Sequence, residues 1–258
     1  MPSTTAQSTW DARIARAREL ASIRPAARDL LLFYAALAEY QRTLAAGARD
    51  AGTFDIDIVI KAIPEFLDWL RSAGRADLAD SVDVDRVTAA LRQKSNDSHS
   101  LPAEAGSHPA EAALFVIESL VQAFAEHFGN VDAPPSAPFP MRCPRCSAPP
   151  VAAVLREEGH GAKRSLLCAI CLLEWECLRI VCPACGEQEF DRLPVYTAEQ
   201  FTHVRIDACD RCHHYIKTID LSKDGLAVPC VDDIASVSLD LWARERGYTR
   251  IRQNVFGF

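Results

Sequence analysis

The chain has 258 residues, of which 49% are apolar and 24% are charged, and its formal net charge is −7. This length accommodates two domains, and the composition is typical of a globular protein. The acidic balance argues against nucleic acid as a partner, because binding to phosphates requires a basic surface.

The start of the sequence, MPSTTAQSTW, is polar, and no apolar run approaches the length of a bilayer span. We therefore expect a soluble, cytoplasmic protein with no membrane span. Ten cysteines without an export signal indicate a reducing compartment. In such a compartment, CxxC pairs are more often metal ligands or redox thiols than structural disulfides.

Apolar residues recur every three to four positions through residues 10–128, which predicts an α-helical domain over residues 1–130. These stripes are more typical of a helix-bundle core than of a cofactor site. Pro64 lies inside one stripe, so we expect a kink or a break near Ala62. The polar segment 95–107 is predicted to be a loop.

Residues 131–142 (VDAPPSAPFPMR) are rich in proline and contain little apolar surface to bury. Such a segment is typical of an extended, semi-rigid linker. We predict a domain boundary here, between the helical domain and the cysteine-rich part of the chain.

Eight cysteines beyond the linker form four CxxC pairs, which are Cys143/Cys146, Cys168/Cys171, Cys182/Cys185 and Cys209/Cys212. The first two pairs precede the last two by 39 and 41 positions, so the pattern is an internal repeat. It predicts two tandem modules, over residues 143–179 and 180–225. The spacers inside the modules have 21 and 23 residues, and each is long enough for a β-hairpin.

The predicted strands of the first hairpin are 151–155 and 164–167, and those of the second are 190–196 and 201–206. Alternating apolar residues from Leu173 to Val181 predict a strand that joins the modules. The overall expectation is an α+β fold.

Residues 226–258 are predicted to form a C-terminal helical segment. Its helix is expected over residues 232–247, with Asp232 or Asp233 as the N-terminal cap and Gly247 at the end.

Two CxxC turns joined by a hairpin can place four thiolates at the corners of a tetrahedron, which suits Zn²⁺ and iron equally. The simplest pairing is within each module, although a crossed pairing is also compatible with the spacing. Redox dithiols are the competing interpretation, but they usually occur as one pair at a helix N-terminus. With eight thiolates and two divalent ions, the C-terminal half would carry a charge of about −6.

The remaining candidates for ligands fit less well. Cys177 and Cys230 are predicted to be ordinary buried residues. His213 and His214 follow a CxxC pair, but four cysteines in each module already complete a tetrahedron. The sequence has no nucleophile elbow, phosphate-binding glycine loop or HExxH motif, so we predict a binding protein and not an enzyme.

The stretches CPRCSAPPVAAVL, LLCAICLLEWECLRIVCPACG, DACDRCHHYIKTID and VDDIASVSLD resemble the formate dehydrogenase accessory protein FdhE family. The likeness covers about residues 140–245. It implies two rubredoxin-like sites, usually described with iron, and an α-helical domain. It also implies a cytoplasmic role in the maturation of formate dehydrogenase, through its catalytic subunit. Ser147 and His213 depart from the family, because a small glycine commonly stands at these positions.

Two other functions compete with this expectation, namely a zinc-ribbon module that binds nucleic acid and a rubredoxin-type electron-transfer protein. The acidic charge disfavours the first. As a candidate surface for the partner, we consider the segment between the modules, around Trp175 and Arg179.

Overall fold

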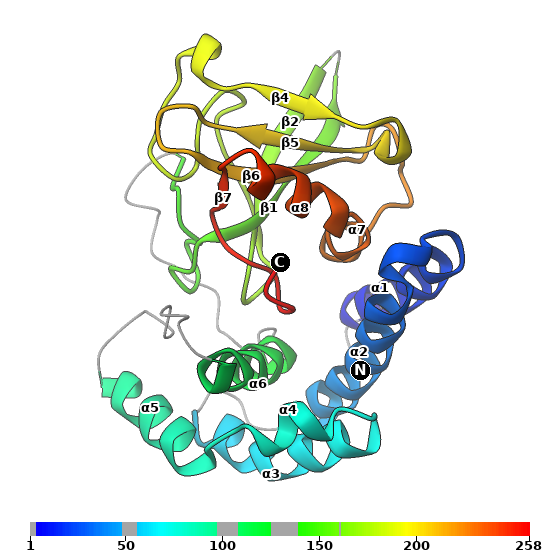
Figure 1. Ribbon diagram of the computed structural model, residues 1–258, viewed down its shortest axis with the longest axis vertical. Coiled ribbons are helices and arrows are strands. Elements are labelled where there is room, and N and C mark those ends of the chain that lie inside the picture. The colour runs from blue at the N-terminus through cyan, green and yellow to red at the C-terminus, as the bar shows by residue number, and fades with distance from the viewer. Residues whose placement is uncertain (1–3, 48–55, 97–107, 125–138, 160) are drawn as a thin grey trace.

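The structure, a computed structural model, describes residues 4–47, 56–96, 108–124, 139–159 and 161–258 (Figure 1). Helices form one half of the molecule and a twisted sheet with two further helices forms the other. Most of the predicted loop and of the predicted linker lies outside the described residues. The exact domain boundary therefore stays a prediction.

The first half of the chain is helical, as predicted. Its elements are α1 (Thr4–Ile23), the short 3-10 helix η1 (Pro25–Ala27), α2 (Arg28–Gly47), α3 (Ile56–Ser72), α4 (Ala76–Asp80), α5 (Val84–Asn96) and α6 (His108–Phe124). None of the helices in the described residues has the length and apolar content needed to cross a bilayer.

We expected a kink or a break near Ala62; helix α3 continues through Pro64, so the break is wrong. A proline inside a helix costs about 3 kcal/mol. Ile63, Phe66 and Leu70 surround it on the same helix and are fully buried. Their burial is worth about 1.5–3 kcal/mol each, which outweighs the missing hydrogen bond.

The second half contains one continuous sheet. Its strands are β1 (Pro150–Glu158), β2 (Gly161–Cys168), β3 (Glu174–Glu176), β4 (Val195–Thr197), β5 (Val204–Ala208), β6 (His214–Asp220) and β7 (Thr249–Arg250). The order is β3-β2-β1-β6-β5-β4, and β7 also pairs with β6. Each module therefore contributes three strands in the same order, and the parallel pair β1–β6 joins the two units. The repeat seen in the cysteine spacing is a repeat of structure.

The first hairpin, β1–β2, is confirmed, whereas the second is shorter than predicted. Residues Phe190–Arg192 (η4) form a 3-10 turn instead of strand, and a second 3-10 turn, Glu199–Phe201 (η5), includes Phe201, the first residue of the other predicted strand. Local hydrogen bonds replace the ladder there, for example from the N–H of Arg192 to the carbonyl of Glu189 at 3.0 Å.

The predicted joining strand is reduced to β3. Beyond it, the Arg164 guanidinium donates to the carbonyls of Leu178 and Val181, at 3.4 and 3.0 Å. These carbonyls thus bind a side chain of β2 instead of a neighbouring strand.

The C-terminal helix is divided into α7 (Pro229–Ala235) and α8 (Val237–Glu245), and Asp232 and Asp233 lie inside α7 instead of capping it. The division has a local cause. The Ser236 hydroxyl donates to the Asp232 and Asp233 carbonyls, at 2.8 and 3.0 Å, and Lys217 Nζ donates to the Asp233 carbonyl at 2.6 Å. Side-chain donors that compete for the carbonyls of a helix weaken its backbone hydrogen bonds and bend it.

One hydrophobic core joins the helical half to the first module. Residues of α2, α3 and α6 pack in it with Cys143, Cys168 and Cys171, and Trp175 is part of the same core. A second core lies between the sheet and α8, and a third packs α1 and α2 against α7. The two halves are therefore held together by shared apolar contacts in at least two places.

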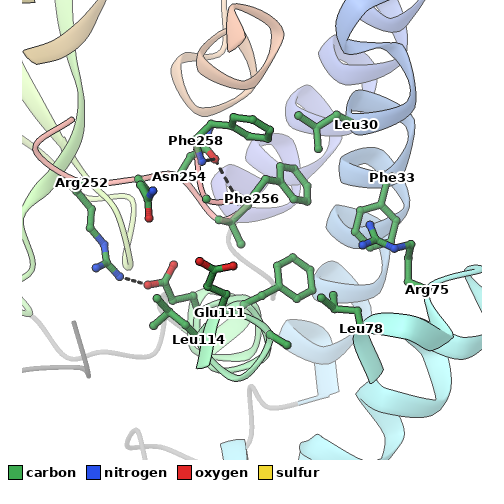
Figure 2. Close-up of a pocket in the computed structure, with 16 residues that line it drawn as sticks. Leu30, Phe33, Arg75, Leu78, Glu111, Leu114, Arg252, Asn254, Phe256 and Phe258 are labelled. Atoms are coloured by element: carbon green, nitrogen blue, oxygen red, sulfur yellow. Dashed lines mark hydrogen bonds and ion pairs between the residues drawn. The ribbon is translucent and has the colours of Figure 1, made fainter. Parts of the chain in front are cut away.

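The C-terminal residues run between α6 and α2 and line a cavity of about 360 Å³ (Figure 2). The Phe256 ring packs against Phe33 and Phe115, with ring centroids 5.9 and 6.1 Å apart. Arg252 forms an ion pair with the buried Glu118 on α6. This tail links the helical half to the sheet.

The Glu118 ion pair predicts a pH dependence of stability. Burial raises the pKa of Glu118 from 4.5 to about 7, although Arg252 opposes the shift. Between these two pH values, Glu118 is therefore protonated in the native state and ionised in the unfolded chain. This group's contribution to the free energy of unfolding is fully present below about pH 4.5 and is lost as pH rises through about 7, a change of roughly 3 kcal/mol.

Glu118→Gln should flatten this part of the stability curve, measured by urea unfolding at several pH values. Glu111→Gln, at an exposed position on the same helix, should keep the wild-type slope. An unchanged slope in Glu118→Gln would contradict this account of the tail.

Candidate metal centres

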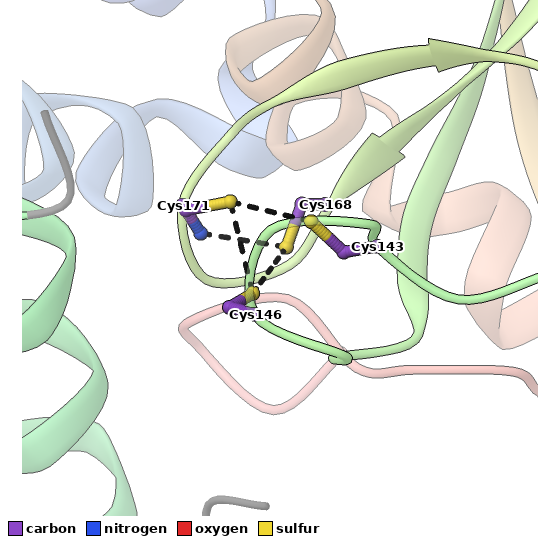
Figure 3. Close-up of side chains that lie close together, drawn as sticks. All are labelled: Cys143, Cys146, Cys168 and Cys171. Carbon is purple, nitrogen blue, oxygen red and sulfur yellow. Dashed lines mark hydrogen bonds between the residues drawn. The ribbon is translucent and has the colours of Figure 1, made fainter. Parts of the chain in front are cut away.

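Cys143, Cys146, Cys168 and Cys171 form the first four-cysteine group (Figure 3). The first pair precedes β1, and the second begins at Cys168, the last residue of β2, so the hairpin brings the two pairs together. The sulfur atoms are 3.5 Å apart in Cys143–Cys171, 3.3 Å apart in Cys146–Cys168 and 3.7 Å apart in Cys146–Cys171.

Cys182, Cys185, Cys209 and Cys212 form the second four-cysteine group. Here the two pairs flank β4 and β5, and the sulfur atoms are 3.6 Å apart in Cys182–Cys212 and 3.7 Å apart in Cys185–Cys209. All eight predicted cysteines are thus brought together, and the grouping is within each module. The crossed pairing is not found.

The four CxxC turns share one backbone conformation. In each, the N–H of the first cysteine donates to the carbonyl five residues later, at 2.8–2.9 Å. The residue after the second cysteine has a positive φ in every turn. These residues are Ser147 (58°), Leu172 (51°), Gly186 (77°) and His213 (56°). Ser147 and His213 therefore adopt the conformation that favours glycine, and the turn forms without a glycine there.

Since a side chain in this conformation strains the backbone, Gly186→Ala should lower the free energy of unfolding by about 1 kcal/mol. No atom lies within 4 Å of the added Cβ, so a clash cannot contribute. The converse change, Ser147→Gly, should raise stability by a smaller amount, because glycine also gains freedom in the unfolded chain. Urea unfolding of both variants tests the pair, and a neutral Gly186→Ala would contradict it.

The distances fit a tetrahedral ion better than disulfides. A tetrahedron with metal–sulfur distances of about 2.3 Å has sulfur–sulfur edges of about 3.8 Å. A disulfide requires about 2.05 Å, and all ten cysteines are free thiols. Backbone N–H groups also point at the sulfurs, and those of Ile170 and Cys171 donate to Cys168 Sγ at 3.3 and 3.4 Å. Both groups could hold a metal ion.

The electrostatics of the first group lead to the same conclusion. Hydrogen bonds from Cys146, Cys168 and Cys171 hold the pKa of Cys143 well below its usual value. Hydrogen bonds to Cys143 and Cys146 raise the pKa of Cys168 well above it. Ionisation of one thiol thus opposes ionisation of its neighbour. Four thiolates can coexist here only beside a cation.

The two groups differ in exposure. In the first, Cys143, Cys168 and Cys171 are buried in the core shared with the helical half. In the second, Cys185 is exposed and Cys212 is partly exposed. The first group is therefore more deeply buried, with only Cys146 partly exposed, whereas the second opens to the surface.

Four other sequence candidates lie outside both four-cysteine groups. Cys177 is buried, as predicted, and Cys230 lies 3.5 Å from the Tyr34 hydroxyl. His213 and His214 stay out of the second group, and His214 Nδ1 lies 2.9 Å from the Cys212 carbonyl.

Of the two residues that mark the candidate partner surface, Trp175 and Arg179, only Arg179 is exposed. Trp175 is buried, and its Nε1 donates to the Pro140 carbonyl at 2.8 Å. It is therefore part of the core. Arg179 is exposed and lines a separate cavity.

A buried network of charges was not predicted. Lys217 on β6 is fully buried, and its Nζ lies 2.6 Å from Asp240 on α8 and 3.1 Å from Asp233 on α7. Arg250 on β7 contacts both carboxylates. Although burial opposes it, the charges of Arg250 and Lys217 hold the pKa of Asp233 below its usual value. The network clamps both helices to the sheet.

A third cluster of possible ligands, His203, Asp224 and Asp232, is occupied by a protein cation. Arg16 on α1 lies 2.5 Å from Asp224 and 2.7 Å from Asp232. His203 Nε2 lies 2.8 Å from Asp232. We interpret this cluster as an ion-paired contact between α1 and the C-terminal half.

Comparisons with known proteins agree with this architecture. The family model described as FdhE, C-terminal domain, matches residues 180–256. The Protein FdhE homolog of Aquifex aeolicus is 43% identical over 121 residues, which cover 46% of this chain and 43% of that protein. The chain therefore spans less than half the length of this relative. The homolog of Haemophilus influenzae strain PittEE is 26% identical over 98% of this chain and 89% of its own length.

A solved structure shares the fold over nearly the whole chain. The crystal structure of the FdhE protein from Pseudomonas aeruginosa matches with a TM-score of 0.64 at 24% identity, over 99% of this chain and 96% of that one. The resemblance in fold therefore includes the helical half as well as the sheet.

Proposed function

We propose that the chain is a member of the FdhE family and an accessory protein in the maturation of formate dehydrogenase. The observation that carries the proposal is the duplicated four-cysteine unit in a chain whose C-terminal part matches the FdhE C-terminal domain. The partner is the catalytic subunit of formate dehydrogenase, and the chain acts on it by binding and not as an enzyme. Its place is the cytoplasm.

Each four-cysteine group holds one ion in this proposal, with the eight cysteines as ligands. A tetrathiolate ion cross-links the two CxxC turns of its module, and an iron ion would add one-electron chemistry. The resemblance favours iron, whereas the sulfur geometry accommodates zinc equally well. A filled tetrahedron leaves no position for a substrate, which supports a binding role over a catalytic one.

Co-purification tests the proposal. The full chain, carrying an affinity tag, is produced together with the catalytic subunit of formate dehydrogenase from the same organism. We expect a complex that survives size-exclusion chromatography, and lower formate dehydrogenase activity in a strain that lacks the chain. No association, together with unchanged activity in that strain, would contradict the proposal.

Electron transfer is a second candidate, and the exposed Cys185 is the observation that favours it, because a redox partner could approach the second group closely. A protein that acts in this way should be coloured when purified without added metal. Its visible thiolate–iron absorption should bleach reversibly with a physiological reductant. A colourless protein containing zinc would exclude this role.

A further inference from the structure

A cavity of about 350 Å³ lies beside the second four-cysteine group, on the face of the sheet formed by alternate residues of β4 and β5. One wall is the segment between the modules, residues 179–183, which includes Cys182. Phe190 of η4, Leu193 and Val195 also line the cavity. The floor includes Arg205 and Asp207 of β5, together with Arg164 of β2.

The rim of this cavity is apolar and exposed. Phe190 is 77% exposed, Val195 50% and Ile180 49%. The described residues include seven large apolar side chains with such exposure, and three of them line this one cavity. Isolated exposed apolar residues are common, but a group of them around a cavity is typical of a binding surface.

The charged residues in the cavity are three arginines and one aspartate. Asp207 is already saturated, because it accepts from Arg205 Nε at 2.8 Å, from Arg164 Nη2 at 3.2 Å and from the Thr218 hydroxyl at 2.7 Å. The surplus of positive charge contrasts with a net charge of −7 for the whole chain. It would be complementary to a carboxylate in a partner.

Two of the arginines retain unused donors. Arg164 is 3% exposed, and its Nε has no hydrogen-bond partner. Arg179 is exposed and makes one long hydrogen bond, of 3.5 Å, to the Ala162 carbonyl. In the described part of the chain, no carboxylate pairs with Arg179.

We propose that this cavity is the docking site for an extended segment of the partner protein, in which an apolar side chain stands next to an Asp or Glu. The apolar side chain packs between Ile180, Phe190 and Val195, and the carboxylate contacts Arg179. Since Cys182 lines the same cavity, the docked segment lies against the second four-cysteine group. This inference deepens the proposed function and rests on it.

The first test measures binding of the tagged full chain to the formate dehydrogenase catalytic subunit. Phe190→Ala combined with Ile180→Ser should weaken binding about tenfold or more, as truncation of interface anchors does. Leu226→Ser is the matched control, because Leu226 is equally exposed but lies away from the cavity. Arg179→Glu should also weaken binding, whereas Arg86→Glu on the surface of α5 should not.

The two proposals can fail separately in this test. Wild-type affinity in all the cavity variants, or equal loss in the Leu226→Ser control, would overturn the docking site and leave the proposed function intact. Absence of binding by the wild-type chain would contradict the proposed function itself.

A second test examines the cavity without the subunit. The probes are fluorescent peptides that carry Phe beside Glu, and matched peptides with Lys in place of Glu. The wild-type chain should prefer the Glu peptide, and Arg179→Glu should reverse the preference, measured by fluorescence anisotropy. Equal binding of both peptides, or no binding of either, would overturn the proposed docking site.

Discussion

Replacement of Cys168 by Ser is expected to prevent the chain from reaching its native fold. Cys168 is fully buried in the core that joins the helical half to the first module. A structural zinc ion contributes roughly 10–16 kcal/mol of apparent folding free energy at neutral pH. The free energy of unfolding of most domains is only about 5–15 kcal/mol. The folding free energy lost with the ion therefore exceeds the net stability that the remaining contacts supply. Circular dichroism and size-exclusion chromatography should show lost cooperativity and aggregation.

The matched variant is Cys185→Ser in the second group, where the side chain is exposed. It should lose one ion and loosen the β4–β5 hairpin, but it should keep the helical half and the first module folded. Cys177→Ser, a change of a buried cysteine outside both groups, controls for the loss of a thiol as such and should retain both ions. A Cys168→Ser variant that unfolds as cooperatively as the wild type would show that the first group does not stabilise the fold.

Replacement of Lys217 by Met is expected to lower the free energy of unfolding by about 3–5 kcal/mol, because it leaves buried carboxylates without sufficient compensation. Asp233 and Asp240 are essentially inaccessible to solvent, and only Arg250 would remain to neutralise them. The Lys and Met side chains have similar lengths, so the lost stability results mainly from the missing charge and not from a change in volume. Urea unfolding at neutral pH measures the effect.

Lys223→Met, at an exposed position in the loop after β6, should change stability by no more than about 0.5 kcal/mol. The double variant Lys217→Met/Asp240→Asn should recover part of the loss, because it removes one of the stranded charges. Equal stabilities of Lys217→Met and Lys223→Met would contradict the role of the network.

The cysteine clusters could be predicted from sequence because ligand spacing is a local property. Two residues between cysteines form one turn, and a spacer of 21 or 23 residues forms one hairpin. Nothing distant has to be known to bring Cys143 and Cys168 together. The helices of the first half were predictable for a similar reason, since their apolar periodicity is contained within each segment.

The features that were missed depend on contacts between distant segments. The parallel pairing of β1 with β6 joins residues that are 65 positions apart, such as Ala152 and Lys217. No local turn motif in the sequence predicts this pairing. The position of Lys217 opposite two acidic residues of α7 and α8 follows only from that pairing. Asp233 has the residue type and sequence position of a helix cap. In the fold it instead pairs with Lys217 and Arg250 in the buried charge network.

Native mass spectrometry of the full chain, purified without added metal, is the most direct test of the central claim that each four-cysteine group holds one ion. We predict two ions per wild-type chain, one ion in Cys185→Ser and two in Cys177→Ser. A mass that shows disulfide bonds and no metal, or loss of both ions in Cys185→Ser while the chain stays folded, would contradict two independent tetrathiolate sites.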